Sequence, residues 1–198
     1  MKVDIGIQTS AELPRGITLT YVYHRVPSNL TGDRLKPLNC LKASPPNLYK
    51  QHVKKYEYRP QALQRRIHGL DCYWNDVLHF TPIHPGKVLE GLRKCGLETT
   101  TLGRWFRFDV RELGFDQTNT VIFWSPNQEF GDWKESKEDF MPYRETELSQ
   151  LSELPSKTLC FYQERIDKEK VPLLFFRTPH VLFKGTVALK NGVEITII

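Results

Sequence analysis

Three protonatable side chains, Asp76, His79 and His84, lie close together in residues 74–85. Two prolines interrupt regular helix in this segment, and titratable groups on irregular backbone are common in active sites. A histidine titrates near neutral pH, so His79 or His84 could transfer a proton while Asp76 fixes the tautomer of the ring. The alternative is that Asp76, with Asn75, only caps a turn.

The same residues could also bind a metal ion. Asp76, His79 and His84 offer oxygen and nitrogen donors that suit zinc, manganese or iron, and His24 or His180 could complete the shell. The spacing is not that of His-Glu-x-x-His, and a strand would direct Asp76 and His79 to opposite faces. A metal-dependent hydrolase that uses Asp76, His79 and His84 is therefore only the third of our functional hypotheses, after the two given at the end of this section. We do not expect a bound metal ion.

Positive charge is concentrated in the first half of the chain. Residues 1–111 hold 18 Lys and Arg against 9 Asp and Glu, whereas residues 112–198 hold 10 against 14. Between Arg34 and Arg66 the only acidic residue is Glu57, and tyrosines are interleaved with the cations. We expect this basic region to contact nucleic acid or another polyanion, unless it is simply a solvated helix face. The residues expected to contact phosphate are Lys50, Lys54, Lys55, Arg59, Arg65 and Arg66.

The clearest predicted strand covers residues 16–26. Its apolar and aromatic side chains alternate with threonines, which is the pattern of a strand with two different faces. The alternation places His24 opposite Tyr21 and Tyr23, near the end of the strand, where a loop follows.

Helices are expected mainly in the first half. Residues 45–67 predict two helical pieces, the second beginning at Pro60 and ending at Gly69, and a further helix carries Val88, Leu89, Leu92 and Cys95 and ends at Gly96. An acidic stretch at 129–153 predicts a loop and then a helix from about Tyr143. Strands are expected at 104–110, 119–125, 158–163, 171–177, 180–188 and 193–198.

This order of elements predicts an α+β fold, formed by a single domain over residues 1–198. A mostly antiparallel sheet would run from residue 104 onward and include the strand at 16–26. No glycine-rich phosphate loop follows any predicted strand, which excludes kinases and dinucleotide-binding folds of the usual kind.

The composition of the chain indicates its cellular location and the state of its cysteines. No stretch reaches the roughly 18 apolar residues of a membrane span, and the first residues lack the apolar region of a signal peptide, so we expect no membrane contact and a cytoplasmic location. The four cysteines form no Cys-x-x-Cys pair, which favours reduced thiols over a zinc ribbon or a redox dithiol.

Three segments resemble ADP-ribosyltransferases. Residues 23–30, followed by Leu35 and by residues 37–38, are similar to the opening strand and loop of that family, where a Tyr-His pair and a downstream Asn-Leu enter the NAD pocket. Residues 75–85 resemble the aspartate, aromatic and proline-rich run of the DarT-like enzymes that modify DNA bases, and residues 177–187 resemble their last catalytic strand. The resemblance implies NAD as cofactor, contacted by Tyr23, His24, Arg25 and Asn29.

Two positions depart from the family pattern. Ile83 stands where the family has an essential arginine, with His84 beside it, and His180 stands where the family has its catalytic glutamate. Cleavage of the nicotinamide bond creates positive charge on the ribose, which a carboxylate stabilises and a histidine cannot. Glu164 could supply the missing carboxylate instead. The resemblance therefore implies altered or lost transferase activity, with His79, His84, Asp76 and Glu164 as the catalytic candidates.

We therefore expect an ADP-ribosyltransferase-like protein that binds NAD or a nucleotide and acts on, or docks to, nucleic acid. The alternative is a non-enzymatic module that binds nucleic acid or protein. The arrangement of His24, His79, His84 and His180 discriminates between the two. A shared pocket favours an enzyme, whereas a packed strand between His79 and His84 favours a binding module.

Overall fold

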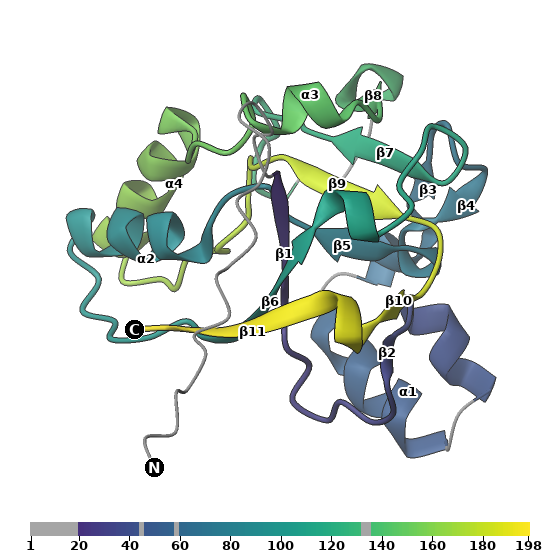
Figure 1. Ribbon diagram of the computed structural model, residues 1–198. Coiled ribbons are helices and arrows are strands. Elements are labelled where there is room, and N and C mark those ends of the chain that lie inside the picture. The colour runs from purple at the N-terminus through teal and green to yellow at the C-terminus, as the bar shows by residue number, and fades with distance from the viewer. Residues whose placement is uncertain (1–19, 44–45, 58–59, 132–135) are drawn as a thin grey trace, which may run out of the picture.

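The computed structural model describes residues 20–43, 46–57, 60–131 and 136–198. Its centre consists of two sheets (Figure 1), and every strand pair in the described residues is antiparallel. The first sheet has the order β1-β6-β11, formed by Tyr21–Arg25, Gly103–Asp109 and Gly192–Ile197. The second has the order β5-β9-β7-β8, formed by Leu78–Phe80, His180–Phe183, Thr120–Phe123 and Phe140–Pro142.

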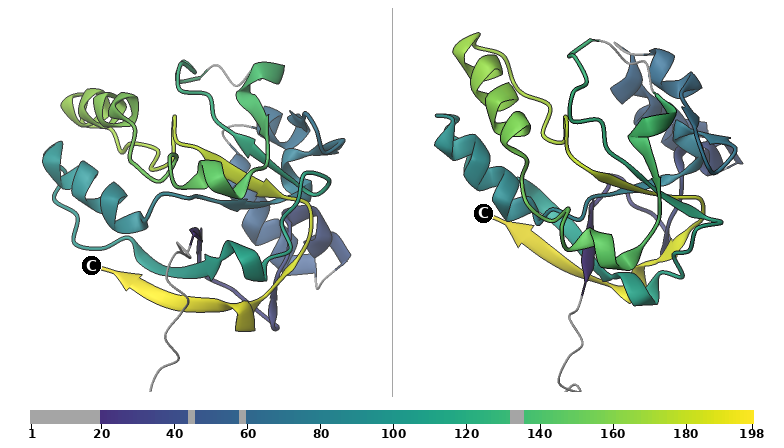
Figure 2. Two further views of the ribbon diagram at one scale, coloured as in Figure 1. Left: turned by 45° about the horizontal axis from the view of Figure 1, so that its top comes forward. Right: turned by 90° about the horizontal axis from the view of Figure 1, so that it is seen from above.

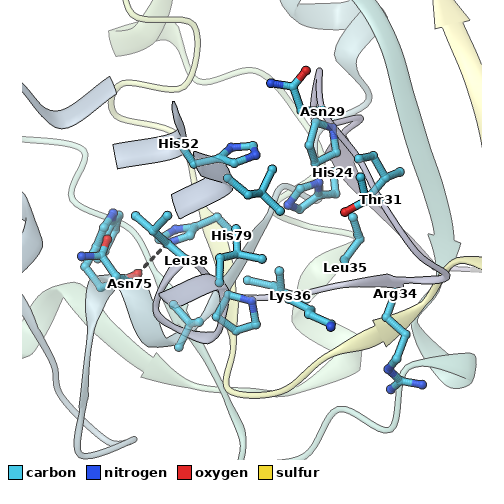
Figure 3. Close-up of a pocket in the computed structure, with 18 of the residues that line it drawn as sticks. His24, Asn29, Thr31, Arg34, Leu35, Lys36, Leu38, His52, Asn75 and His79 are labelled. Carbon is cyan, nitrogen blue, oxygen red and sulfur yellow. Dashed lines mark hydrogen bonds between the residues drawn. The ribbon is translucent and has the colours of Figure 1, made fainter. Parts of the chain in front are cut away.

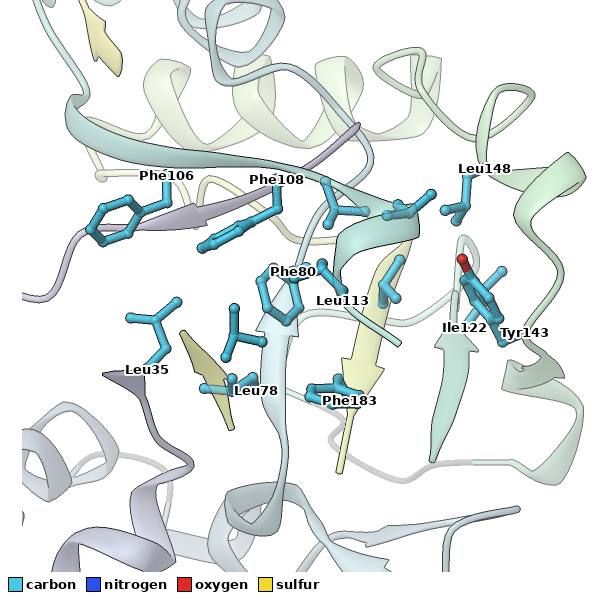
Figure 4. Packing of buried hydrophobic residues seen from close by; sticks show 14 residues of the cluster. Leu35, Leu78, Phe80, Phe106, Phe108, Leu113, Ile122, Tyr143, Leu148 and Phe183 are labelled. Carbon is cyan, nitrogen blue, oxygen red and sulfur yellow. The ribbon is translucent and has the colours of Figure 1, made fainter. Parts of the chain in front are cut away.

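The main hydrophobic core fills the space between the two sheets (Figure 4). Alternation along β6 directs Phe106 and Phe108 toward the second sheet, from which Phe80 of β5 and Phe183 of β9 face them. The rings of Phe80 and Phe108 meet edge to face, with centroids 5.8 Å apart. The apolar face of each sheet is therefore buried against the other.

Helices α2 (Pro85–Lys94) and α4 (Ser156–Asp167) lie side by side at one end of the sheets (Figure 2). They form a second core that includes Val88 and Leu92 from α2 and Phe161 from α4. Gly96 follows α2 with a φ of +88°, in the left-handed region that ends many helices, so the predicted end of this helix is confirmed.

A small helical lobe occupies the opposite side of the molecule (Figure 1). It contains α1 (Pro46–Val53) and the 3-10 helices η1 (Leu38–Ala43), η2 (Lys54–Tyr56), η3 (Pro60–Gln64) and η4 (Trp74–Asp76). The strand pair β2 (Arg34–Leu35) with β10 (Val187–Ala188) joins it to the rest. The hairpin of β3 (Arg66–Ile67) and β4 (Cys72–Tyr73) packs on the second sheet through side chains. The lobe's own core consists of Leu38, Tyr56 and Ala62.

Short helices complete the described part of the chain. They are η5 (Val110–Glu112), η6 (Lys137–Asp139), α3 (Glu145–Leu148) and η7 (Leu189–Asn191). Helix α3 lies within the predicted helical region after Tyr143.

The predicted α+β class is confirmed, and its strands are divided between two sheets. The strands expected at 104–110, 119–125 and 193–198 correspond to β6, β7 and β11. The strand expected at 180–188 is divided into β9 and β10 by residues 184–186. The strand expected at 16–26 corresponds to β1 over Tyr21–Arg25, while residues 16–19 lie outside the described residues.

Three predictions are wrong. Residues 158–163 belong to helix α4, because Thr158, Phe161 and Tyr162 are buried together on one helical face. Residues 171–173 have no regular structure and residues 174–177 form a turn, so no strand occurs there. The helical piece that begins at Pro60 ends at Gln64 instead of Gly69, because the next residues pair with β4.

Candidate functional site: a histidine groove

Three histidines from three strands line one groove: His24 of β1, His79 of β5 and His180 of β9. The groove consists of two overlapping pockets of about 480 and 610 Å³, and all three histidines line both of them. We call this site the histidine groove. It unites residues that are more than 150 positions apart in the sequence.

Backbone pairing sets the positions of these histidines. Tyr23 donates its N–H to the carbonyl of Thr81 at 2.8 Å, and Thr81 donates to the carbonyl of Tyr23 at 3.0 Å. This single bridge joins β1 to the segment after β5, and hence the first sheet to the second. Along β5, Leu78 and Phe80 face the core, so His79 points to the opposite side, toward the groove.

Each imidazole is oriented by a backbone carbonyl. His79 donates its Nε2–H to the carbonyl of Trp74 at 2.8 Å, and His180 donates its Nε2–H to Phe175 at 3.1 Å. His24 donates from Nδ1 to the carbonyl of Arg25 at 2.7 Å. A carbonyl can only accept, so in the neutral ring the other nitrogen of each imidazole is the hydrogen-bond acceptor.

The pKa of His180 is lowered to about 4, mainly by burial; the hydrogen bond to Phe175 opposes this shift, and the positive charge of Arg65 adds to it. His180 is therefore neutral at physiological pH. A neutral ring can accept a hydrogen bond from a ligand and adds no charge to the groove.

Arginines supply the charge at one end of the groove. The Arg65 guanidinium is buried between aromatic rings, 4.7 Å from the centroid of Trp74 and 4.4 Å from that of Phe123. Arg177 donates its Nε–H to the carbonyl of Gln128 at 2.9 Å, and it has a φ of +61°, which costs energy in any residue but glycine. Among the residues that the structure describes, no Asp or Glu lines either pocket of the groove. This end of the groove is thus suited to an anion.

A smaller cavity of about 140 Å³ adjoins the groove and shares His24, His79 and Trp74 with it. Figure 3 shows the rings of His24, His52 and His79 around this space, with Asn29 and Asn75 also at its wall. Most of the remaining wall is leucine, proline and valine. A cavity of roughly 150 Å³ with apolar walls accommodates a benzene ring, so this space, which we call the ring cavity, is large enough for one six-membered ring.

His84 lies outside the groove, although the sequence grouped it with His79. It forms the N-cap of α2, where its Nδ1 accepts from the N–H of Gly86 at 3.0 Å, and its ring meets Tyr23 edge to face. Burial, followed by the charges of Lys87 and Arg107, lowers its pKa. A structural role at the start of α2 accounts for these contacts.

Asp76 has the capping role that the sequence offered as its alternative. Its Oδ2 accepts from the N–H of Tyr73 at 2.8 Å, and its Oδ1 accepts from the Asn39 amide at 2.6 Å. Asp76, His79 and His84 therefore do not share one site. Among the described residues, no group of His, Cys, Asp or Glu side chains is arranged to hold a metal ion.

Glu164 is not brought to the groove either. It lies exposed on α4 and pairs with Lys168 one helical turn away, at 2.7 Å. Ile83, which the resemblance aligned with an essential arginine, is fully buried in the core beneath α2.

The residues expected to contact NAD lie around the groove and the ring cavity. Tyr23, His24 and Arg25 line the groove, and Asn29 lines the ring cavity, where its Nδ2 donates to Gln51 at 2.6 Å. Tyr23 is largely buried, and this burial raises its pKa.

The cations of the basic region do not all reach the surface as expected. Lys50 and Lys54 are exposed, and Arg66 is exposed in an ion pair with Asp71. Arg65 is buried in the groove instead of facing solvent. Arg59 and the side chain of Lys55 lie outside what the structure describes.

Sequence reasoning missed His52, Arg177 and Trp74 as site residues. His52 lies in a predicted basic helix and Trp74 beside an acidic cap, so neither carried a motif. Arg177 begins the segment 177–187, and the resemblance of that segment to the last catalytic strand of the transferases was the signal that could have identified it.

Comparisons of the chain with protein-family models, with curated proteins and with solved structures find no match. Within the described residues, no helix combines the length and the apolar character needed to cross a bilayer.

Proposed function

We propose that this chain is an ADP-ribosyltransferase-like protein that binds NAD or another nucleotide in the histidine groove. The observation that carries the proposal is the lining of the groove. His24, His79 and His180 share it with Arg65 and Arg177, and no carboxylate of the described part of the chain lines it. An anionic ligand with aromatic character fits this combination best.

The parts of the groove match the parts of a nucleotide. Arg65 and Arg177 would bind phosphate oxygens, since a guanidinium forms charge-assisted hydrogen bonds with them. The acceptor nitrogens of the imidazoles would bind ribose hydroxyls. The ring cavity is large enough for one six-membered ring, such as nicotinamide or a pyrimidine.

The same lining argues for altered or lost transferase activity. Breaking a nicotinamide–ribose bond places positive charge on the ribose, and a carboxylate is the group that stabilises it. In the described residues no carboxylate lines the groove, and Glu164 is paired with Lys168 on the surface. Binding without nicotinamide release is therefore the expected behaviour.

Calorimetric titration with NAD, ADP-ribose and AMP tests the proposal. We expect binding of at least one of them, and we expect Arg177→Gln to weaken it by roughly tenfold or more, because a hydrogen bond to a charged group contributes about 1.5–3 kcal/mol. The matched control is Arg111→Gln, since Arg111 lies outside the groove and pairs with Asp109. Absence of binding by all three ligands would refute the proposal. Release of nicotinamide at catalytic rates would refute only the expected loss of transferase activity and would leave the proposed nucleotide binding intact.

Docking of the basic region 34–66 to nucleic acid remains a separate prediction. The exposed positions of Lys50 and Lys54 are compatible with it. A purely binding module would show strongly salt-dependent affinity for nucleic acid and no change on His79→Ala.

A further inference from the structure

A further open pocket of about 600 Å³ lies in the helical lobe, between η1, α1, η3 and η4. It shares Asn75 with the ring cavity but none of the residues of the histidine groove. Besides one leucine, its lining consists of two tyrosines, three side-chain amides and one lysine: Tyr49, Tyr73, Asn39, Gln64, Asn75 and Lys42. We call it the amide pocket.

Tyr73 offers an aromatic surface at this pocket. It is 51% exposed, which is unusual for so large a ring, whereas Tyr49 is partly buried against the small core of the lobe. Aromatic side chains that line an open, positively charged pocket are common binding surfaces for unstacked nucleic-acid bases, because every base has a flat face.

Asn75 is buried at this pocket without a complete set of hydrogen bonds. Only 4% of the residue is exposed, and its Oδ1 finds no hydrogen-bond partner in the described part of the chain. A buried amide oxygen in this condition is costly, and an N–H group of a ligand would satisfy it once the Asn75 side chain turned, since the oxygen itself is covered. Asn and Gln amides can both accept from and donate to the edge of a base, so Gln64 adds to the same capacity.

The charge of the pocket is positive. Lys42 holds its ammonium 5.4 Å from the centroid of the Tyr49 ring, and no described Asp or Glu lines the pocket. Lys50 and Lys54 are exposed on the neighbouring turns of α1 and η2. A phosphate chain that passes over this lobe would therefore meet several cations.

We propose that the amide pocket holds one unstacked base of a single-stranded nucleic acid, stacked on Tyr73 and hydrogen-bonded to Asn75 and Gln64, with Lys42 at the adjoining phosphate. A duplex does not fit this arrangement, because its bases are stacked and paired and present only their edges in the grooves. This inference does not depend on nucleotide binding in the histidine groove.

Fluorescence anisotropy with labelled DNA and RNA single strands, and with a duplex of the same sequence, tests the inference. We expect single strands to bind more tightly than the duplex. We expect Tyr73→Ala to weaken single-strand binding by roughly tenfold, since stacking contributes about 1–3 kcal/mol per base, while Tyr73→Phe keeps the affinity within about twofold. A preference for RNA over DNA would assign a contact to the 2′-hydroxyl.

Further variants separate this site from the rest of the molecule. Lys42→Gln should lower the slope of log affinity against log salt by about 0.7, the value for one phosphate of a single strand. Phe130→Ala is the matched control, because Phe130 is also an exposed ring, at 47%, but lies outside the amide pocket. Gln64→Glu tests the same site if Tyr73→Ala fails to fold, since it adds a negative charge at an exposed position and should also weaken binding.

Equal affinity for duplex and single strand, or single-strand binding unchanged by both Tyr73→Ala and Gln64→Glu, would overturn the inference. Calorimetry with NAD, ADP-ribose and AMP on the Tyr73→Ala protein gives an independent result. The affinity of the Tyr73→Ala protein for these three ligands should match that of the wild type. Failure of this inference and failure of the proposed nucleotide binding are therefore distinguishable.

Discussion

Replacing His180 with glutamine should remove part of the acid sensitivity of this protein. In the folded state burial lowers the pKa of His180 to about 4, whereas in the unfolded state the ordinary pKa of about 6.5 applies. Between these two values the unfolded chain binds a proton that the folded chain does not, so stability falls as the pH falls from about 6.5 to about 4. Above pH 6.5 both states are neutral at this residue, and it contributes no pH dependence.

The magnitude follows from the size of the shift. At pH 5 the solution lies about 1.5 pH units below the unfolded-state pKa, and each unit corresponds to about 1.4 kcal/mol, which gives a loss of about 2 kcal/mol relative to pH 7.5. This is an upper value, because one edge of the His180 ring lines the groove and can meet water. Glutamine is the suitable replacement, since its amide can also donate to the carbonyl of Phe175.

Urea unfolding of the wild type and of His180→Gln at pH 7.5 and pH 5 measures the effect. The wild type should lose up to about 2 kcal/mol more unfolding free energy than the variant between the two pH values. His84, whose pKa is also lowered, is present in both proteins, so its contribution cancels in the comparison. Equal losses in the two proteins would refute the assignment of a neutral, buried His180.

Three further outcomes are expected. Ile83→Arg should destabilise the protein by several kcal/mol in urea unfolding, because it buries a charge in the core, whereas Ile83→Val should cost only about 1 kcal/mol. Gly96→Ala should lower stability by roughly 1–2 kcal/mol, since alanine is strained at a φ of +88°; an unchanged melting temperature would contradict this. A thiol reagent should modify the exposed Cys40 and Cys160 in the native protein. Cys72 should react only after unfolding, because it is buried and its pKa is raised to about 11.

Strands with clear alternation could be predicted from the sequence, and elements stabilised by tertiary contacts could not. Residues 104–110 alternate around Phe106 and Phe108, and they form β6 as expected. The run at 158–163 is rich in β-favouring residues, yet it is helical because Thr158, Phe161 and Tyr162 reach the core beside α2 only when they share one helical face. The secondary-structure propensity of six residues does not indicate which side chains must face the core together.

The candidate site was predictable only in part, for a geometric reason. The sequence singled out His24, His79, His84 and His180 as candidates, and three of the four line the groove. His84 follows His79 by five residues, but the chain turns between β5 and α2, so its ring is directed to a helix start. Separation along the sequence does not determine which side chains share a pocket once the backbone reverses.

The bridge between Tyr23 and Thr81 has a consequence for how the groove can change. Its walls belong to different sheets, and near His24 the spacing between them is held by two main-chain hydrogen bonds in addition to the side chains of the core. Substitutions in the lining can therefore alter what the groove recognises while its width stays the same. Breaking the two hydrogen bonds of this bridge would also allow the two walls of the groove to separate. Exchange of the Tyr23 and Thr81 amide hydrogens would report opening of the groove separately from unfolding of either sheet.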